Sequence, residues 1–349
     1  LSLYLHIHSV TRRRILMLDI SLVILAGRDI GNLLRLSTSL TNITQYLRQV
    51  IVVLDNSSYQ NPPDHPSFNS LSNLLFLLYE GNKKQPGMRN LALKQCTASY
   101  VWFIDDDTTV LSTSASRLLD LQRFLDRSPE VAFAAGKIIE SRSYTYRQVL
   151  ARRPFQFFYG PLYHFGVNPS AYKGIVPFIS TKSLSLPRAD FVQGTNMLYR
   201  RSKLVAIGGF NELLSRGYSS FEDSQPALIL SGLDYLGVYT DLICVKHHKL
   251  PRFGGNSRTV TNTKYLEAYF RNYALSLLHF VPGPVTHALS MLIFHMFYLL
   301  LNDVRYCIAS PSLSRLFSIA QLLALNTLTI LRLSAQRIIM RPQSTFPYR

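Results

Sequence analysis

Four short apolar runs in the first third of the chain alternate with segments whose apolar residues have helical spacing. The runs lie at 19–26, 50–54, 74–79 and 100–104. The intervening segment over 30–47, and a later one from Pro86 to about Cys96, carry apolar residues three or four positions apart. Strands that alternate with helices in this way predict a parallel sheet built from βαβ units. The first half of the chain is therefore predicted to be Rossmann-like.

The fourth apolar run leads directly into three carboxylates, Asp105, Asp106 and Asp107. Ligands of open α/β sheets bind beyond the carboxyl ends of the strands. Alternate residues of an extended chain point to the same side, so Asp105 and Asp107 are predicted to converge, with Asp106 opposed. Two converging carboxylates suit a divalent cation that carries a phosphorylated substrate. The alternative is that the triplet caps a helix that begins near Ser114.

The second half of the chain is predicted to continue with mixed elements. A helix is expected over 115–126, and strands are expected at 131–135, 191–199, 235–239 and 242–245. Another helix is expected after Glu222-Asp223, with Pro226 in its first turn and Gly232 just past its end. Residues 140–190 are rich in Tyr, Pro and Arg without clear periodicity, which is typical of a functional loop region.

The composition restricts the class of partner. The 349 residues carry a net charge of +17 and a pI near 9.9, which calls for an anionic partner such as nucleic acid, lipid headgroups or a phosphorylated substrate. The three cysteines are far apart and show no CxxC spacing. They favour a reducing compartment, and they exclude a disulfide framework and a zinc site of the CxxC type.

Further short motifs follow one another in a fixed order. They are Asp55-Asn56-Ser57, Met88–Leu93, Gly194–Met197, Arg200-Arg201, Gly208–Glu212, Glu222-Asp223, His247-His248 and Arg271-Asn272. Together with the acidic strand end, this series over most of residues 19–280 resembles glycosyltransferase family 2. The resemblance implies an α/β GT-A fold, which is a Rossmann-like nucleotide-diphospho-sugar transferase fold. It implies a catalytic domain over 19–260, with a nucleotide-binding half at 19–110 and an acceptor half at 111–260.

The resemblance also implies roles for individual residues. Asp105 and Asp107 would be the DxD motif that holds the ribose and a divalent metal, Mn²⁺ or Mg²⁺, with His247 as a further ligand. Asp223 would be the general base, which takes the proton of an acceptor hydroxyl. Residues predicted to bind the nucleotide or the sugar donor are Asp55, Arg89, Asp105, Asp106, Gly194, Asn196 and Glu222.

Several of these residues have simpler interpretations. Asp55 lies in a sequence typical of a turn, and Glu222-Asp223 is typical of a helix cap. The histidines could be surface residues at a strand end, and His248 fits the spacing as well as His247 does. Arg252 and Arg258 flank a glycine-containing loop that could close over a diphosphate, which we state as a hypothesis.

Two departures from the family pattern are informative. The first strand ends in Leu25-Ala26-Gly27-Arg28 instead of the usual Pro-Thr-Tyr-Asn, so nucleotide contacts there are not predicted. No Gln-x-x-Arg-Trp motif follows the histidines, and the only tryptophan is Trp102. That motif marks processive synthases, so we expect transfer of a single sugar.

The two ends of the chain form separate regions. Residues 1–18 are an extension without the features of a secretory signal, so a cytoplasmic active site is expected. Residues 261–349 are predicted to be a helical appendage with apolar stretches at 285–301 and 316–333 and a basic fringe. Such helices suit peripheral attachment to an anionic membrane surface. Packing on the catalytic domain or on a second copy is an equal alternative, and a membrane span is the third choice.

The expected function is therefore inverting, metal-dependent transfer of one sugar from a UDP-, GDP- or dTDP-sugar. The acceptor would be a hydroxyl of a polyprenyl-phosphate-linked or surface glycan. A nucleotidyltransferase on a similar core is the first alternative. It would need a glycine-rich loop with Lys or Arg after the first strand to bind a triphosphate, and Gly27–Gly31 fits this requirement poorly. A nucleic-acid-binding protein is the second, and only residues 144–159 interleave aromatic and basic side chains as it would need. We expect no nucleic-acid partner, and the oligomeric state stays open.

Overall fold

The computed structural model describes residues 17–27, 29–81, 84–111, 113–140, 178–189, 192–215, 221–248, 268 and 271–272. Predictions for residues 1–16, the stretch 144–159, the Arg252–Arg258 loop and the apolar stretches of the tail lie outside these ranges. Within them, no helix is long and apolar enough to cross a membrane.

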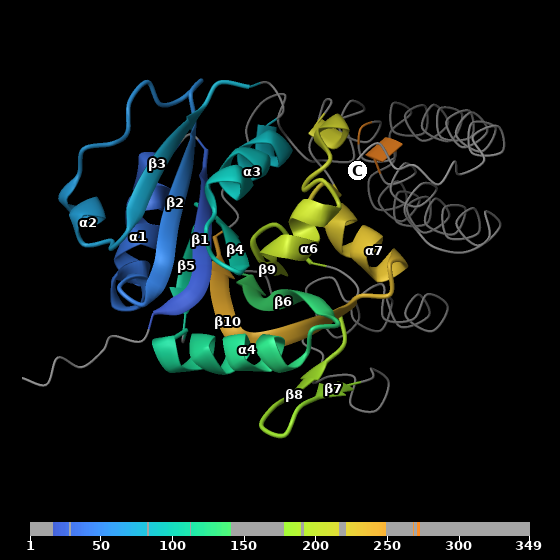
Figure 1. Cartoon of the computed structure of the whole chain (residues 1–349). Coiled ribbons are helices and arrows are strands. Elements are labelled where there is room, and N and C mark those ends of the chain that lie inside the picture. The colour runs from blue at the N-terminus through green and yellow to red at the C-terminus, as the bar shows by residue number, and fades with distance from the viewer. Residues whose placement is uncertain are drawn as a thin grey trace, which may run out of the picture.

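One eight-stranded sheet organises the described part of the chain (Figure 1). Its strands, in chain order, are β1 (Leu18–Ala26), β2 (Leu47–Asp55), β3 (Leu74–Tyr79), β4 (Tyr100–Asp105), β5 (Thr108–Leu111), β6 (Val131–Glu140), β9 (Asn196–Arg200) and β10 (Leu236–His247). Their order across the sheet is β3-β2-β1-β4-β9-β6-β10-β5. A small hairpin of β7 (Phe178–Ser180) and β8 (Ser185–Pro187) forms a second sheet, and Arg188 just after it makes a bridge to Val238 on β10.

The parallel sheet is confirmed for the first half of the chain. Strands β3, β2, β1 and β4 are parallel neighbours, and the strand order reverses direction between β1 and β4. Beyond β4 the sheet is mixed, because β9 runs antiparallel to both β4 and β6, and β5 runs antiparallel to β10. The βαβ pattern therefore continues only as far as β4.

Two sets of helices cover the two faces of the sheet (Figure 1). The longer helices are α1 (Ile30–Thr44), α3 (Lys84–Gln95), α4 (Ala115–Arg127), α6 (Arg201–Ala206) and α7 (Gln225–Gly232), with a short α2 (Pro66–Asn69) and the 3-10 helix η3 (Glu212–Ser215). Alternate residues of β1 point to opposite faces, so Leu22 packs in one core with α1 and α4. Val23 packs in the other core with α3, α6 and α7.

Several boundaries differ from those predicted. The helix expected to reach residue 47 ends at Thr44, because Leu47 already belongs to β2. The strand expected at 191–199 is confined to 196–200, and Gly232 is the last residue of α7 instead of following it. The two strands expected at 235–245 are one strand, β10, whose register shifts between Thr240 and Cys244.

The acidic triplet is not a helix cap. The helix α4 begins after Ser114, whose hydroxyl accepts from Arg117 N–H at 3.4 Å. Strand β5 lies between the triplet and this cap. The capping interpretation is therefore wrong.

A buried polar node joins the two halves of the sheet. The indole N–H of Trp102 on β4 donates to Asn196 Oδ1 at 2.8 Å, and Asn196 Nδ2 donates to the carbonyls of Lys137 and Ile243 at 3.0 and 3.2 Å. These carbonyls belong to β6 and to β10 near its register shift. A Cβ on Gly136 would lie 2.2 Å from the same amide, so only glycine fits beside it. One side chain thus connects β4, β6, β9 and β10.

The node predicts a large stability loss for Asn196→Leu. This change leaves the Trp102 N–H buried without a partner and removes one hydrogen bond from each of two carbonyls, and an unpaired buried group costs about 1–3 kcal/mol. The free energy of unfolding should fall by roughly 3 kcal/mol or more, as measured by urea unfolding. The exposed loop residue Asn61 provides the matched control, Asn61→Leu, which should change it by less than about 0.5 kcal/mol. Equal effects in both variants would contradict this role of the node.

Candidate active site

The three carboxylates follow β4, next to the point where the order of the strands across the sheet reverses. Strand β4 ends at Asp105, and after a turn at 106–107 the chain returns as β5. The Thr108 hydroxyl donates to the carbonyl of Asp105 at 2.7 Å and fixes this turn. Because β1 and β4 are the strands between which the order reverses, the turn sits at the topological switch point where ligands of open α/β sheets bind.

The three carboxylates have different surroundings. Asp105 Oδ2 accepts from the Thr195 hydroxyl at 3.3 Å, and its side chain is about one-fifth exposed. Asp106 Oδ2 accepts from Gly27 N–H at 2.7 Å. Asp106 therefore ties the loop after β1 to the acidic turn, apart from the groups that hold Asp105 and Asp107. The predicted separation of Asp106 from its two neighbours is confirmed.

Burial and like charge both act on the acidic turn. Burial raises the pKa of Asp105, while the Arg89 guanidinium opposes the rise and Asp107 adds to it. Burial raises the pKa of Asp106 to about 7, against the Gly27 N–H and together with the charges of Asp107 and Asp105. The ionised carboxylates therefore repel one another at this turn, and a cation placed among them would relieve the repulsion.

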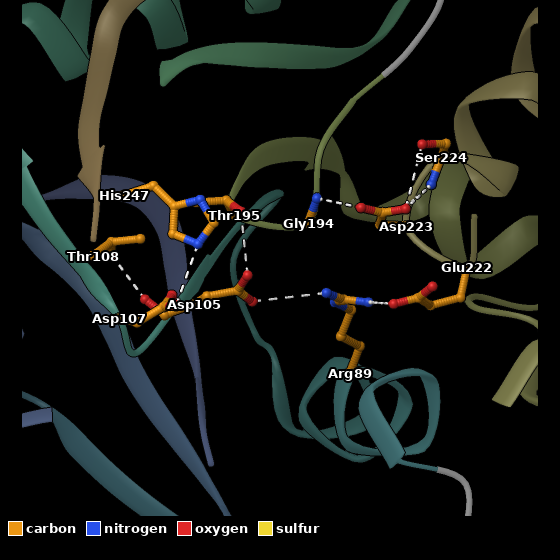
Figure 2. Close-up of polar contacts among 10 residues, drawn as sticks. All are labelled: Arg89, Asp105, Asp107, Thr108, Gly194, Thr195, Glu222, Asp223, Ser224 and His247. Atoms are coloured by element: carbon orange, nitrogen blue, oxygen red, sulfur yellow. Dashed lines mark hydrogen bonds and ion pairs between the residues drawn. The ribbon is translucent and has the colours of Figure 1, made fainter. Parts of the chain in front are cut away.

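The two histidines have distinct positions. Strand β10 pairs with β5 so that His247 lies opposite Thr108, and His247 Nε2 is 3.3 Å from Asp107 Oδ2 (Figure 2). The ring of His248 is hydrogen bonded to the Thr109 hydroxyl at 2.7 Å instead, and its backbone N–H donates to the carbonyl of Asp107. Burial, followed by the charges of Arg35 and Lys246, lowers the pKa of His248. Of the two histidines, His247 faces the acidic turn.

Asp223 is held at the start of α7 by backbone donors. Its Oδ2 accepts from Gly194 N–H at 2.6 Å, and its Oδ1 accepts from Ser224 N–H at 2.8 Å (Figure 2). The N-cap position of α7 is Ser224, so Asp223 precedes the cap and is not itself the capping residue. Its carboxylate fixes the Gly194 loop relative to α7.

A buried arginine lies between the two acidic regions. The Arg89 side chain on α3 is only 1% exposed, with Nη1 3.5 Å from Glu222 Oε1 and Nη2 3.9 Å from Asp105 Oδ1. Figure 2 shows this order, with Asp105 on one side of Arg89 and Glu222 on the other. A Cβ on Gly194 would lie 2.5 Å from Arg89 Nη2 and 3.1 Å from Asp223 Oδ2, so the absence of a side chain there makes room for both groups.

Most predicted site residues therefore come together, although they belong to distant elements. Those that do are Arg89, Asp105, Asp107, Gly194, Glu222, Asp223 and His247 (Figure 2). Asn196 does not, because its amide is fully buried in the node described above. Asp106 contacts the loop after β1 instead, where one of its oxygens accepts from Gly27 N–H.

Asp55 lies at the same edge of the sheet, at the end of β2. Its Oδ1 accepts from Ser57 N–H at 3.0 Å and its carbonyl accepts from Ser58 N–H and Tyr59 N–H. The turn interpretation is thus confirmed as the local structure of Asp55. Contact with a nucleotide base stays a prediction.

Two contributors to the site were missed in the sequence. Thr195 holds Asp105, and Asn90 exchanges hydrogen bonds of 2.8 Å with both the N–H and the carbonyl of Phe210. Both residues belong to the motifs Gly194–Met197 and Met88–Leu93. The motifs identified these positions, but nothing in the sequence alone indicated what their side chains contact.

The described residues fit a divalent metal in part. Asp107 and His247 form a carboxylate–imidazole pair, whereas the two oxygens of Asp105 face the Thr195 hydroxyl and the Arg89 guanidinium. Among these residues no group of three His, Cys, Asp or Glu side chains is placed to hold a metal by itself. This donor set suits a cation such as Mg²⁺, which uses one or two carboxylates and takes its remaining ligands from water and substrate phosphates.

The fold and the site together define a Rossmann-like enzyme of the α/β class with acidic groups at its switch point. The family model for glycosyl transferase family 2 matches residues 21–208 of the 349, which is more than half of the chain. The chain belongs to this family, and it is a glycosyltransferase with the GT-A fold. No curated protein matches it at a significant level.

Solved structures share the fold at low identity. TarS of S. aureus in complex with UDP-GlcNAc is 18% identical with a TM-score of 0.57, over 91% of this chain and 83% of that chain. The mannosyltransferase PcManGT from Pyrobaculum calidifontis, in complex with GDP-Man and Mn²⁺, is 15% identical with a TM-score of 0.51, over 93% and 88% of the two chains. GalNAc-T7 with UDP, GalNAc and Mn²⁺ is 13% identical with a TM-score of 0.50, over 86% and 58%.

Proposed function

We propose that this protein is an inverting, metal-dependent glycosyltransferase that moves one sugar from a nucleotide-sugar to a hydroxyl of a lipid-linked or surface-glycan acceptor. The observation that carries the proposal is the grouping of Asp105 and Asp107 with Asp223 around one site, through Arg89 and Gly194. The similar structures named above contain UDP-GlcNAc, GDP-Man or Mn²⁺, which supports a nucleotide-sugar donor and a divalent metal.

In this proposal the donor diphosphate lies at the acidic turn. Asp105, Asp107 and His247 are the groups that would hold Mn²⁺ or Mg²⁺, and Asp55 would accept a hydrogen bond from a ring N–H of the base. When bound, the metal offsets the negative charge that develops on the departing nucleoside diphosphate.

Asp223 is the proposed general base. Its two oxygens accept backbone N–H bonds from Gly194 and Ser224, which hold the carboxylate in a fixed orientation. The ionised group can take the proton of an acceptor hydroxyl as that oxygen attacks the anomeric carbon. Attack in one step from the side opposite the diphosphate would invert the anomeric configuration.

The remaining residues predicted to bind the donor are proposed to shape the site. Asp106 bonds to Gly27 N–H, Asn196 is engaged in the core node, and Glu222 pairs with Arg89. Gly194 contributes by lacking a side chain where Arg89 and Asp223 meet. Each of them thus has a partner within the protein, or a steric role, that supports the site without a direct donor contact.

We also propose peripheral attachment to the cytoplasmic face of a membrane. The net charge of +17 and the basic, apolar tail suit anionic lipid and a polyprenyl-phosphate acceptor. Asn272, just ahead of the two apolar stretches, is buried and donates to the carbonyl of Leu214 at 2.7 Å. Asn272 is therefore held against η3.

Release of UDP, GDP or dTDP from nucleotide-sugars in the presence of Mn²⁺ tests the proposed reaction. Turnover that needs an acceptor hydroxyl supports sugar transfer. Release of pyrophosphate from a nucleoside triphosphate would indicate the alternative nucleotidyltransferase. A strongly salt-dependent RNA or DNA affinity without either turnover would indicate a nucleic-acid-binding protein.

We predict that Asp107→Ala removes the metal-dependent part of nucleotide binding. A ligand that binds only the folded state raises its melting temperature, so a panel of nucleoside diphosphates with and without Mn²⁺ should show both base preference and metal dependence. In the wild-type protein Mn²⁺ should enlarge the shift given by the preferred nucleotide. In Asp107→Ala the shift should be the same with and without Mn²⁺, and a metal-dependent shift of wild-type size would contradict the assignment.

We predict that Asp223→Asn binds nucleotide normally but transfers sugar poorly. The amide can replace the carboxylate in size but does not take up a proton, so kcat should fall by about 10²–10⁴-fold. The thermal shift with nucleoside diphosphate and Mn²⁺ should match the wild-type shift, which is the control for an intact donor site. Full activity in this variant would remove Asp223 from the role of base.

A further inference from the structure

We infer that Arg89 is a positioning residue, which sets the distance between Asp105 and the Glu222-Asp223 segment, and that it does not bind the donor. This inference deepens the proposed function and rests on it for the roles of Asp105 and Asp223. The sequence alone had suggested a donor contact for Arg89. The contacts of its side chain point to a different role.

The guanidinium faces carboxylates on two elements, although its buried Nε–H has no hydrogen-bond partner among the described residues. One nitrogen faces Glu222 on the segment before α7, and the other faces Asp105 at the end of β4, at 3.5 and 3.9 Å. Glu222 is as buried as Arg89, with a side chain 4% exposed. Since Glu222 and Asp223 are adjacent, a change in the Arg89–Glu222 contact moves the proposed base relative to the acidic turn.

The side chain has little freedom to turn toward a ligand. The guanidinium lies over the ring of Phe210, 5.4 Å from its centroid, and that ring packs edge-on against Phe103 at 5.2 Å and Tyr199 at 6.1 Å. The next residue, Asn90, is locked to the backbone of Phe210 by two hydrogen bonds. On its remaining side, Gly194 approaches so closely that a Cβ would lie 2.5 Å from Nη2.

The charge balance makes the bridge necessary. Arg89 is the only lysine or arginine with a buried side chain within the described ranges. On its two sides lie the carboxylates of Asp105, Glu222 and Asp223. Removing the buried cation while keeping the buried carboxylates is strongly destabilising, because those carboxylates lose the cation that they face. Arg89 therefore holds together groups that would otherwise move apart.

Steady-state kinetics of Arg89→Lys separates positioning from donor binding. Lysine keeps the charge but lacks the planar fork that spans two carboxylates. We expect kcat to fall by about 10²-fold, because small displacements of reacting groups have effects of that size, while the donor KM stays within about threefold. A donor KM raised by about tenfold or more with kcat unchanged would overturn the inference, since that pattern indicates lost ground-state binding.

A stability cycle tests the bridge without any activity measurement. Arg89→Met should lower the melting temperature by at least about 5 °C, and adding Glu222→Gln should recover a large part of that loss because one of the buried carboxylates that faced the missing cation becomes neutral. Arg89→Lys should remain close to the wild-type melting temperature. Arg117→Met, which breaks the exposed contact with Asp241, is the matched control and should change it by less than about 2 °C.

The stability cycle and the assay of sugar transfer test the Arg89 bridge and the proposed function separately. No recovery in the Arg89→Met/Glu222→Gln variant would overturn the bridge even if the protein transfers sugar. If the wild-type protein transferred no sugar from any nucleotide-sugar, the proposed function would fail and the positioning role with it. Recovery in the cycle would then still establish the Arg89–Glu222 bridge as a structural contact.

Discussion

Three consecutive residues, Gly194, Thr195 and Asn196, fix the relation between the core and the site. The amide of Asn196 is buried among β4, β6, β9 and β10, where it pairs with the Trp102 indole and two carbonyls. The hydroxyl of Thr195 reaches Asp105, and the N–H of Gly194 reaches Asp223. Because a buried amide with every partner engaged has one favourable orientation, the node also fixes where the two residues before it point. The proposed metal-binding side and the proposed base are thus positioned by the same short segment.

The second constraint is the electrostatic interaction of Arg89 with the carboxylates of Asp105 and Glu222. Ion pairs that are buried need good geometry and further hydrogen bonds, or desolvation outweighs their attraction. The Arg89 pairs at 3.5 and 3.9 Å are too long for strong hydrogen bonds, so they compensate charge more than they add stability. This geometry is expected if Arg89 keeps the carboxylates in place for the proposed reaction and adds little to the stability of the fold. The hydrogen bonds from Thr195, Gly194 and Ser224 supply the directional part of the same arrangement.

The parts of this fold that sequence could predict are those that depend on local patterns. Strand β3 was predicted residue for residue, and β1 and β4 within one residue, because buried parallel strands are continuous apolar runs. Strand β5 was missed because Thr108–Leu111 is only four residues long and follows directly from the acidic turn. No local sequence pattern predicts that β9 runs antiparallel to its neighbours. Its direction depends on a long connection and on contacts with β4 and β6.

Local sequence patterns were sufficient for only part of the site as well. The family motifs identified Asp105, Asp223 and His247, and the structure brings them into one region. They did not distinguish a residue that lines the site from one that supports it. Asn196 and Asp106 belong to the motifs as clearly as Asp105 does, yet their partners are Trp102 and Gly27. Burial and hydrogen-bond partners depend on residues about 80 to 90 positions away, and no short window of sequence contains that information.

The division of charge across the site gives a physical reason for a metal on one side only. On the side toward α3, Asp105 and Glu222 face the buried Arg89, and Asp223 accepts hydrogen bonds from two backbone N–H groups. On the other side, Asp107 faces His247, which is a cation only when protonated. Further negative charge therefore lies at the turn after β4, where Asp107 follows Asp105, and a diphosphate would add to it. An anionic donor can bind beside these carboxylates only if a cation binds with it, so donor and metal affinity at this site should be coupled.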